Sequence, residues 1–195
     1  TERALRFLPK AINKEGAQFI AAGGNNSIYW LPNHRGGKIL RISNSPDHLS
    51  HDEATKQIGY EDKTSQRVLE RTGRGAVFSE VGVTTRGDPR YRAWGIMEQY
   101  AGSIDKALIG KKSVDVKRRI ILEALDVLGK LVFVEGMAYL DVKTCNFLFR
   151  ESLFNKSKPD VHLTDFDAGW TINFNPKTTE VMFLEQEEIS GSMYL

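Results

Sequence analysis

Residues 139–148 read YLDVKTCNFL and residues 163–167 read LTDFD, and these two stretches indicate both the fold and the chemistry of the chain. They place the carboxylate of Asp141, the amine of Lys143 and the carboxamide of Asn146 in a fixed order. The carboxylate of Asp165 follows, behind a short apolar run. Phosphoryl transfer from a magnesium nucleotide needs such groups, because one positions the accepting hydroxyl, one neutralises the moving phosphoryl and two hold metal.

The spacing of these residues resembles that of eukaryotic-type protein kinases. Asp, Lys and Asn stand at relative positions 0, 2 and 5, and an Asp-Phe pair begins nineteen residues after the Asn. The resemblance implies that Asp141 positions or deprotonates the substrate hydroxyl and that Lys143 neutralises charge on the transferred group. It also implies that Asn146 and Asp165 are oxygen ligands of Mg²⁺ and that ATP is the phosphoryl donor.

Two departures from the kinase pattern accompany these motifs. Tyr139 and Leu140 occupy the positions where kinases usually have His-Arg, so a cation that reads a phosphorylated activation segment is missing. The resemblance then implies activity that does not depend on such phosphorylation. Asp167 replaces the usual glycine of the metal loop, and Gly169 follows two residues later, so the loop loses backbone freedom and gains a carboxylate.

A glycine-rich turn at residues 23–27 (GGNNS) occupies the place of the kinase loop that covers the nucleotide phosphates. Gly23, Gly24 and Asn25 suit that role, because small side chains let backbone amides approach phosphate oxygens and Asn tolerates positive φ. The alternative is an ordinary hairpin turn. The position of the turn before a third strand at residues 38–42 favours the phosphate loop.

That third strand is expected to present a cation to the α and β phosphates, and Lys38 and Arg41 are the two candidates. Arg41 fits the kinase pattern better, because Ile39 then lies two residues earlier, where an apolar side chain covers the adenine. Arg also grips phosphate with two parallel hydrogen bonds. Lys38 stays open as the alternative.

The carboxylate that pairs with this cation is expected on the following helix, at residues 49–71. Glu61 lies twenty residues after Arg41 and is the favoured partner. Glu53 and Glu70 are the alternatives, and an exposed helical glutamate with no partner in the site is the simplest other interpretation.

Residues 94–104 (WGIMEQYAGSI) resemble the strand and hinge that bind the adenine in kinases. Met97 is expected behind the adenine pocket, and backbone groups between Glu98 and Tyr100 are expected to bond the adenine edge. An ordinary buried strand that leads into a loop is the alternative interpretation.

The pattern of elements predicts an α+β fold of the bilobal kinase type. Strand-like segments dominate the first hundred residues, and an amphipathic helix at residues 117–134 precedes the Asp141 loop. We expect one kinase-like domain over residues 1–195, with an antiparallel β small lobe and hinge at about 16–100. The remainder, 101–195, is expected to form a reduced, mainly helical large lobe.

The composition of the chain limits the binding partners and the cellular location that we expect. The net charge of +2, from 27 basic and 25 acidic residues, and the dispersed basic residues give no argument for a nucleic-acid partner, and we expect none. No apolar run reaches the roughly 18 residues of a membrane span. The single cysteine, Cys145, favours a reducing compartment, so we expect a cytoplasmic location, in the cell that makes the protein or in a host cell into which it is delivered.

The resemblance ends after about residue 170, and no Ala-Pro-Glu sequence follows. This implies a shortened or a minimal Ser/Thr kinase, similar to effectors that some pathogenic bacteria inject, whose substrate protein is recognised with the help of residues 171–184 or of an activating or docking partner. Two alternatives remain open: a nucleotide-binding pseudokinase scaffold, and a small-molecule kinase of the inositol phosphate type.

Overall fold

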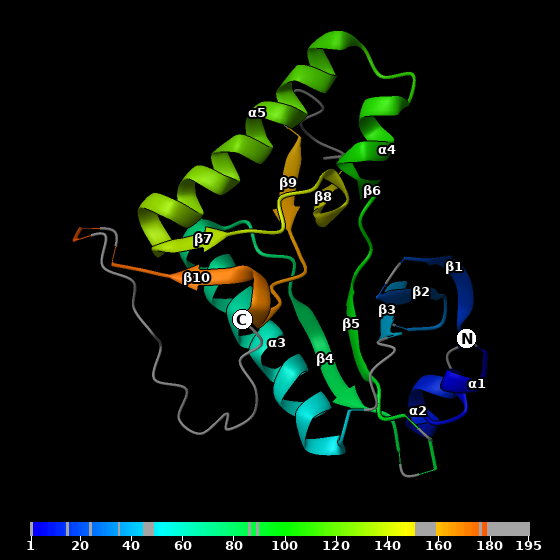
Figure 1. Cartoon of the computed structure of the whole chain (residues 1–195). Coiled ribbons are helices and arrows are strands. Elements are labelled where there is room, and N and C mark those ends of the chain that lie inside the picture. The colour runs from blue at the N-terminus through cyan, green and yellow to red at the C-terminus, as the bar shows by residue number, and fades with distance from the viewer. Residues whose placement is uncertain are drawn as a thin grey trace.

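The computed structural model describes residues 2–178, except residues 15, 24, 35, 45–48, 86, 89, 151–158 and 176. The fold is mixed α+β, as the sequence predicts, and contains a five-stranded antiparallel sheet flanked by helices (Figure 1). The elements of the first half are α1 (Glu2–Leu5), α2 (Lys10–Asn13), β1 (Gln18–Ala22), β2 (Asn26–Leu31), β3 (Lys38–Ser43), α3 (His51–Thr72), β4 (Phe78–Val83) and β5 (Ala93–Glu98).

The sheet has the strand order β1-β2-β3-β5-β4, and every neighbouring pair is antiparallel. Side chains alternate across its two faces because the pleat repeats every two residues. On one face, inward residues of β2, β3 and β5 pack against α1 and α2; this cluster includes Leu8, Ile12, Leu31, Leu40 and Ile42. The short helices α1 and α2 and the turn between them, whose helical periodicity is weak in the sequence, therefore contribute Ala4, Leu8 and Ile12 to the core.

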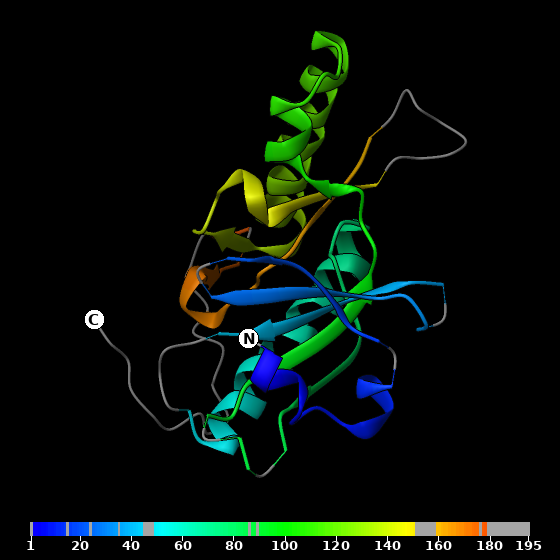
Figure 2. The ribbon, with the colours of Figure 1, turned by 90° about the vertical axis from the view of Figure 1, so that its right-hand side faces the viewer.

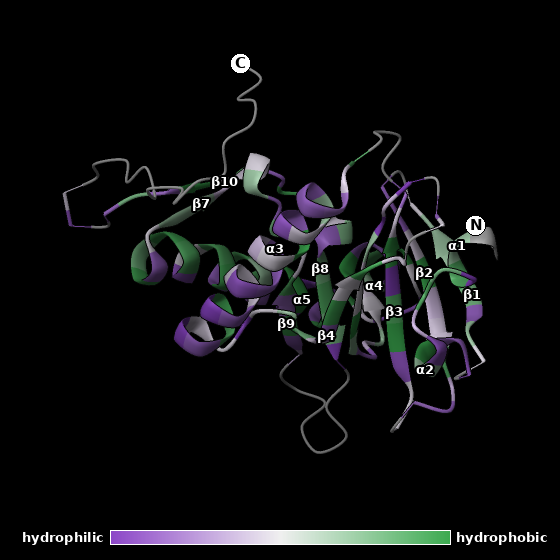
Figure 3. Cartoon of the chain, turned by 90° about the horizontal axis from the view of Figure 1, so that it is seen from below, coloured by the Kyte–Doolittle hydropathy of each residue, from purple (hydrophilic) through white to green (hydrophobic). Residues whose placement is uncertain are grey.

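The opposite face of the sheet packs against α3. Helix α3 starts with a capping box, in which the Ser50 side chain accepts from the Glu53 backbone and the Glu53 side chain accepts from the Ser50 backbone. It ends at Gly73, whose φ of 72° gives a left-handed cap. The helix runs unbroken through Gly59, although glycine in a helix interior lowers the helix propensity. Its surface is largely hydrophilic (Figure 3), with only a few apolar residues toward the sheet.

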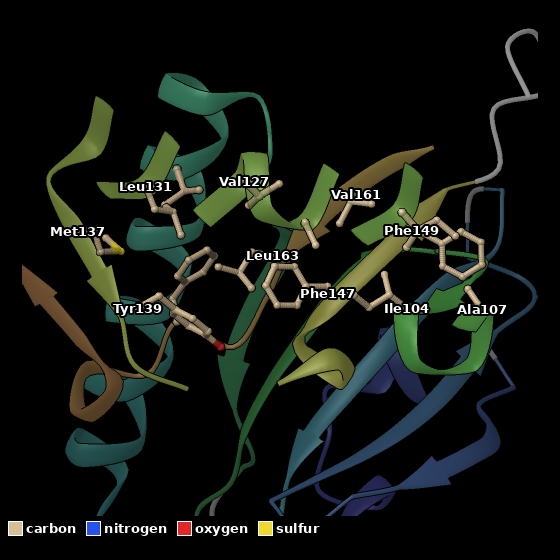
Figure 4. Packing of buried hydrophobic residues seen from close by; sticks show 14 residues of the cluster. Ile104, Ala107, Val127, Leu131, Met137, Tyr139, Phe147, Phe149, Val161 and Leu163 are labelled. Carbon is tan, nitrogen blue, oxygen red and sulfur yellow. The ribbon is translucent and has the colours of Figure 1, made fainter. Parts of the chain in front are cut away.

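The second half of the chain surrounds a separate apolar cluster, built from α5, β7, β8, β9 and Phe166 (Figure 4). Its elements are β6 (Gly102–Ser103), α4 (Ile104–Ile109), α5 (Val114–Lys130), the π-helix η1 (Leu131–Glu135), β7 (Met137–Tyr139), the 3₁₀-helix η2 (Thr144–Asn146), β8 (Phe147–Arg150), β9 (Asp160–Leu163), the 3₁₀-helix η3 (Ala168–Trp170) and β10 (Thr171–Asn173). Figure 2 shows α5 standing above these strands, away from the five-stranded sheet.

This half differs from expectation in two ways. It is less helical than predicted, because short strands form a β6-β8-β9 sheet and a β10-β7 ribbon on either side of the loop that carries Asp141. Strands of two to four residues carry too few alternating positions to be detected in sequence. The predicted apolar side of α5 is also wrong in part: Ile120 and Ala124 are buried, whereas Ile121 and Leu125 are 45% and 58% exposed.

Candidate active site

A cavity of about 430 Å³ opens between the sheet, α3 and the loops that follow β7 and β9. Six of the residues singled out from the sequence line it: Asn25, Arg41, Glu61, Asp141, Lys143 and Asp165. They come from five separate segments, so the fold brings together side chains that are up to 140 residues apart. Asp167 and Trp170 also line the cavity, from the loop that follows Asp165.

Arg41 connects the sheet to both the helix and the metal loop. Its guanidinium forms an ion pair with Glu61 of α3, and its Nη1 donates to Asp165 Oδ1 at 3.3 Å. The side chains of Arg41 and Glu61 are only 12% and 8% exposed. Although burial opposes the charge, the attraction of Glu61 raises the pKa of Arg41, so the guanidinium stays protonated. The pairing expected between Arg41 and Glu61 is therefore present.

Successive side chains of β3 point to opposite faces of the sheet, so Arg41 and Lys38 lie on different faces. Ile39 and Arg41 point to the face that α3 covers, whereas Lys38 lies on the other face with Leu40 and Ile42. Lys38 forms an ion pair with Glu98, its cross-strand neighbour on β5. Neither of these two side chains lines the cavity. Lys38 therefore lies outside the cluster around Asp165, and so does the Glu98 side chain.

The Arg41 guanidinium packs against the aromatic ring of Phe78 of β4. The Arg41 guanidinium lies 5.0 Å from the centre of the Phe78 ring. The ring reaches that place across Gly95 of β5, where a Cβ atom would stand 2.5 Å from it. The cation–π contact adds to the ion pair and fixes the guanidinium at the cavity wall. Sequence analysis missed Phe78, because nothing local shows which aromatic residue crosses a glycine on the next strand.

The loop between β7 and β8, for which the sequence predicts a catalytic role, is ordered by contacts among its own polar side chains. Lys143 Nζ lies 2.7 Å from Asp141 Oδ2, and this hydrogen bond is the main cause that raises the pKa of Lys143. Asn146 Nδ2 donates to the same Asp141 oxygen at 2.9 Å and to the Asp141 backbone carbonyl at 3.1 Å. Asp141, Lys143 and Asn146 thus form one connected group, with Asn146 buried beneath it.

Tyr139 joins this loop to the metal loop. Its hydroxyl accepts from Asn146 Nδ2 at 2.6 Å and donates toward the carbonyls of Thr164 (3.2 Å) and Asp165 (3.3 Å). Burial holds the pKa of the Tyr139 phenol well above its ordinary value, so the proton needed for these bonds is retained. The ring meets Phe166 edge to face, with centroids 5.9 Å apart. The sequence analysis noted Tyr139 only because kinases usually have histidine at this position, and it did not predict these contacts.

The backbone of Asp165 adopts φ +68°, the only positive φ of a described residue other than glycine. Such a conformation is uncommon outside glycine and is concentrated at functional sites. It turns the Asp165 carboxylate toward Arg41. Asp167, two residues on, caps η3 by accepting from the Gly169 backbone N–H at 3.0 Å. The Asp167 side chain thus stabilises the backbone of the loop after Asp165.

Asp165 and Asn146 carry the oxygen atoms that the kinase resemblance assigns to a metal ion. The Asp165 carboxylate is 32% exposed and lines the cavity. Asn146 is buried and does not itself line the cavity; its Nδ2 is engaged with Tyr139 and Asp141, and its Oδ1 accepts from Cys145 Sγ at 3.6 Å. Oxygen donors of this kind suit Mg²⁺, which keeps several waters and needs only one or two protein ligands. Across the described ranges, no group of three or more His, Cys, Asp or Glu side chains is placed to hold a metal ion without other ligands.

The residues expected around an adenine form an apolar cluster beside the cavity. Met97 is buried with Ile58, Ala76, Phe78 and Ala93, and the partly buried Ile39, Tyr100 and Leu148 pack against them. Ile39 and Tyr100 come from β3 and the segment after β5, whereas Leu148 comes from β8, below the catalytic loop. Leu148 was not singled out as a site residue, although it stands two residues after Asn146.

The glycine turn is described in part. Gly23 and Asn25 lie between β1 and β2, the Gly23 backbone N–H donates to the Asn26 carbonyl at 2.8 Å, and Asn25 lines the cavity. Gly24 lies outside the described residues. The turn joins paired strands, so it is a hairpin turn as well as a wall of the cavity.

In comparisons with known proteins, no protein-family model matches the chain, and no curated protein matches it in a sequence search. Among the helices that the structure describes, none combines the length and the apolar character needed to cross a bilayer.

Proposed function

We propose that the protein is a kinase that transfers the terminal phosphoryl group of ATP to Ser or Thr hydroxyls of a protein substrate, and that its fold is a reduced form of the bilobal protein kinase fold. One observation carries the proposal: Arg41 contacts both Glu61 and Asp165 in a cavity that also holds Asp141 and Lys143. In kinases an ion pair between an interior strand cation and a helix carboxylate is in place beside the nucleotide phosphates, and a nearby loop aspartate holds the metal.

The residues would divide the work as follows. Arg41, held by Glu61 and Phe78, would bind the nonreacting phosphates. Mg²⁺, held by Asp165 and Asn146, would neutralise charge on the phosphates when bound. Asp141 would accept the hydroxyl proton or aim the hydroxyl, and its hydrogen bond from Asn146 keeps the carboxylate in place.

Lys143 would neutralise the negative charge on the phosphoryl group during its transfer. It is half exposed and lies 2.7 Å from Asp141, so a short movement of its flexible side chain would bring the ammonium to the transferred phosphoryl. A lysine at this position favours a protein substrate over a small metabolite, following the kinase resemblance. The free Cys145 is compatible with a reducing, cytoplasmic location.

A nucleotide-binding scaffold without turnover is the second candidate. It is favoured by Asp167, which adds a carboxylate beside Asp165 and replaces the flexible glycine of the loop. In that case Mg-ATP stabilises the fold but no phosphoryl group is transferred.

Transfer from γ-labelled ATP separates these functions. The protein is incubated with labelled Mg-ATP and, in parallel, with generic proteins, inositol phosphates or sugars. The kinase proposal expects label on protein hydroxyls and its loss in Asp141→Ala and in Asp165→Ala. Label that persists in both variants would refute it, thermal stabilisation without label would support the scaffold, and label only on a small molecule would identify a metabolite kinase.

A further inference from the structure

Helix α3 is attached to the strand that follows the metal loop. The Tyr60 hydroxyl lies 2.8 Å from the Thr171 hydroxyl, and Arg67 Nη2 donates to Asn173 Oδ1 at 2.8 Å. Thr171 and Asn173 are nearly buried and point from the same face of β10. Figure 1 shows β10 running beside α3.

A buried carboxylate strengthens this attachment. Glu135, at the end of η1, has a side chain that is only 3% exposed, and it forms ion pairs with Arg67 and, at 3.3 Å, with Arg71. A carboxylate with so little access to water is costly unless cations face it. We call Tyr60, Arg67, Glu135, Thr171 and Asn173 the α3 anchor.

The spacing of the anchor matches the geometry of a helix against a strand. Tyr60 and Arg67 are seven residues apart and share one side of α3, about 10 Å apart along its axis. Thr171 and Asn173 are about 7 Å apart along β10. The long side chain of Arg67 spans the difference. Glu61 is the neighbour of Tyr60 in sequence, and it points to the sheet and Arg41 instead.

Strand β10, which α3 contacts, is held in place by backbone hydrogen bonds to β7 and Leu140. β10 pairs with β7 in register, Thr171 opposite Tyr139 and Asn173 opposite Met137. The Leu140 backbone N–H also donates to the Trp170 carbonyl at 2.8 Å. The segment after Asp165 is therefore tied to the strand before Asp141, and the anchor extends this rigid unit to α3.

We infer that Tyr60 and Arg67 are positioning residues, which hold α3 so that Glu61 meets Arg41 without a phosphorylated activation segment or a bound activator. The inference rests on the proposed function. Helix α3 needs such a device, because it buries only three apolar side chains (Ala54, Ile58 and Val68). Ile58 packs against β4 and β5, whereas Val68 packs in the apolar cluster of the second half, so apolar contact with the sheet alone fixes the helix loosely.

A double-mutant cycle tests this role. The anchor variant combines Tyr60→Phe with Asn173→Ala and removes both hydrogen bonds to β10. It is expected to lower kcat/KM for Mg-ATP about tenfold, mainly by raising KM, because fewer molecules hold the Arg41–Glu61 pair. In a Glu61→Gln background the same two changes are expected to cost less than about twofold, since the group through which they act is already altered.

Two variants serve as controls. Tyr91→Phe removes a phenol hydroxyl near the other end of α3, where the Tyr91 ring contacts His51, and should leave kcat/KM unchanged. Asn173→Asp keeps an oxygen acceptor for Arg67 and should restore most of the activity lost in Asn173→Ala. Equal losses in the wild-type and Glu61→Gln backgrounds, or no loss at all, would overturn the inference.

Hydrogen exchange keeps the test independent of catalysis. The anchor variant is expected to raise exchange rates of α3 amides at least about tenfold while those of β2 and β3 stay unchanged. This holds whether or not the protein transfers phosphoryl groups, so failure of the proposed function is distinguishable from failure of the anchor. Unchanged exchange in α3 would show that the anchor does not hold the helix.

Discussion

Replacement of Glu61 by glutamine tests the buried ion pair at the centre of the site. The change keeps the size of the side chain but removes the charge that faces Arg41. Both side chains are nearly inaccessible to water, at 8% and 12% exposure, so the guanidinium would be left in the interior with Asp165, at 3.3 Å, and the nearby Asp167 as anionic neighbours.

Removal of one partner from a buried pair costs about 3–5 kcal/mol of unfolding free energy. Because Asp165 remains and the glutamine amide offers an acceptor, we expect the lower end, about 3 kcal/mol. Affinity for Mg-ATP should also fall about tenfold or more, since a displaced Arg41 no longer meets the phosphates.

Glu98→Gln is the matched control, with the same chemical change on the other face of the sheet, where Glu98 of β5 pairs with Lys38 of β3. Glu98 is 53% exposed in its pair with Lys38, so the expected cost is below about 1 kcal/mol. Urea denaturation of both variants gives the comparison. Equal destabilisation of the two, or a Glu61→Gln protein as stable as wild type, would refute the assignment of Arg41 and Glu61 as the interior pair.

Three further predictions follow from the same structure. Gly95→Ala should cost about 1–3 kcal/mol and weaken nucleotide binding, because its Cβ would displace Phe78 from beneath Arg41; an unchanged urea midpoint would contradict this. Ser50→Ala should cost about 1 kcal/mol by removing the cap of α3, measured by urea denaturation, and no cost would mean that the cap is dispensable. Burial opposes ionisation of Asp160, but the hydrogen bond from His162 and the charges of Arg74 and Arg150 lower the pKa of Asp160 below its ordinary 3.8. The ionised carboxylate therefore stabilises the fold above pH 3.8, and this stabilisation is lost as the pH falls. The stability difference between wild type and Asp160→Asn should therefore shrink on acidification below about pH 4; a constant difference would rule this out.

The local parts of the site could be predicted from the sequence. The alternation of β3 favoured Arg41 over Lys38, because only one of the two shares a face with Ile39. The helix after β3 placed Glu61 within reach, since helical spacing and the distance along the chain limited the candidates. The Asp141–Asn146 spacing likewise lies within a single loop, and its contacts are short in sequence.

The long-range parts could not be predicted. Phe78 reaches Arg41 across a glycine on a third strand, and Tyr139 contacts the backbone of a loop 25 residues away. The α3 anchor depends on Asn173, 106 residues after Arg67. Such contacts follow from how segments pack together, and neither hydrophobic periodicity nor residue spacing carries that information. The apolar face of α5 was missed for a related reason, because the helix is apolar on more than one side.

The most direct test of the central claim is a titration of the protein with ATP, with and without Mg²⁺, followed by calorimetry. We expect wild type to bind ATP at least about tenfold more tightly when Mg²⁺ is present, and we expect Asp165→Asn to lose that dependence on the cation. Absence of ATP binding by wild type, or a magnesium effect that is unchanged in Asp165→Asn, would contradict the account.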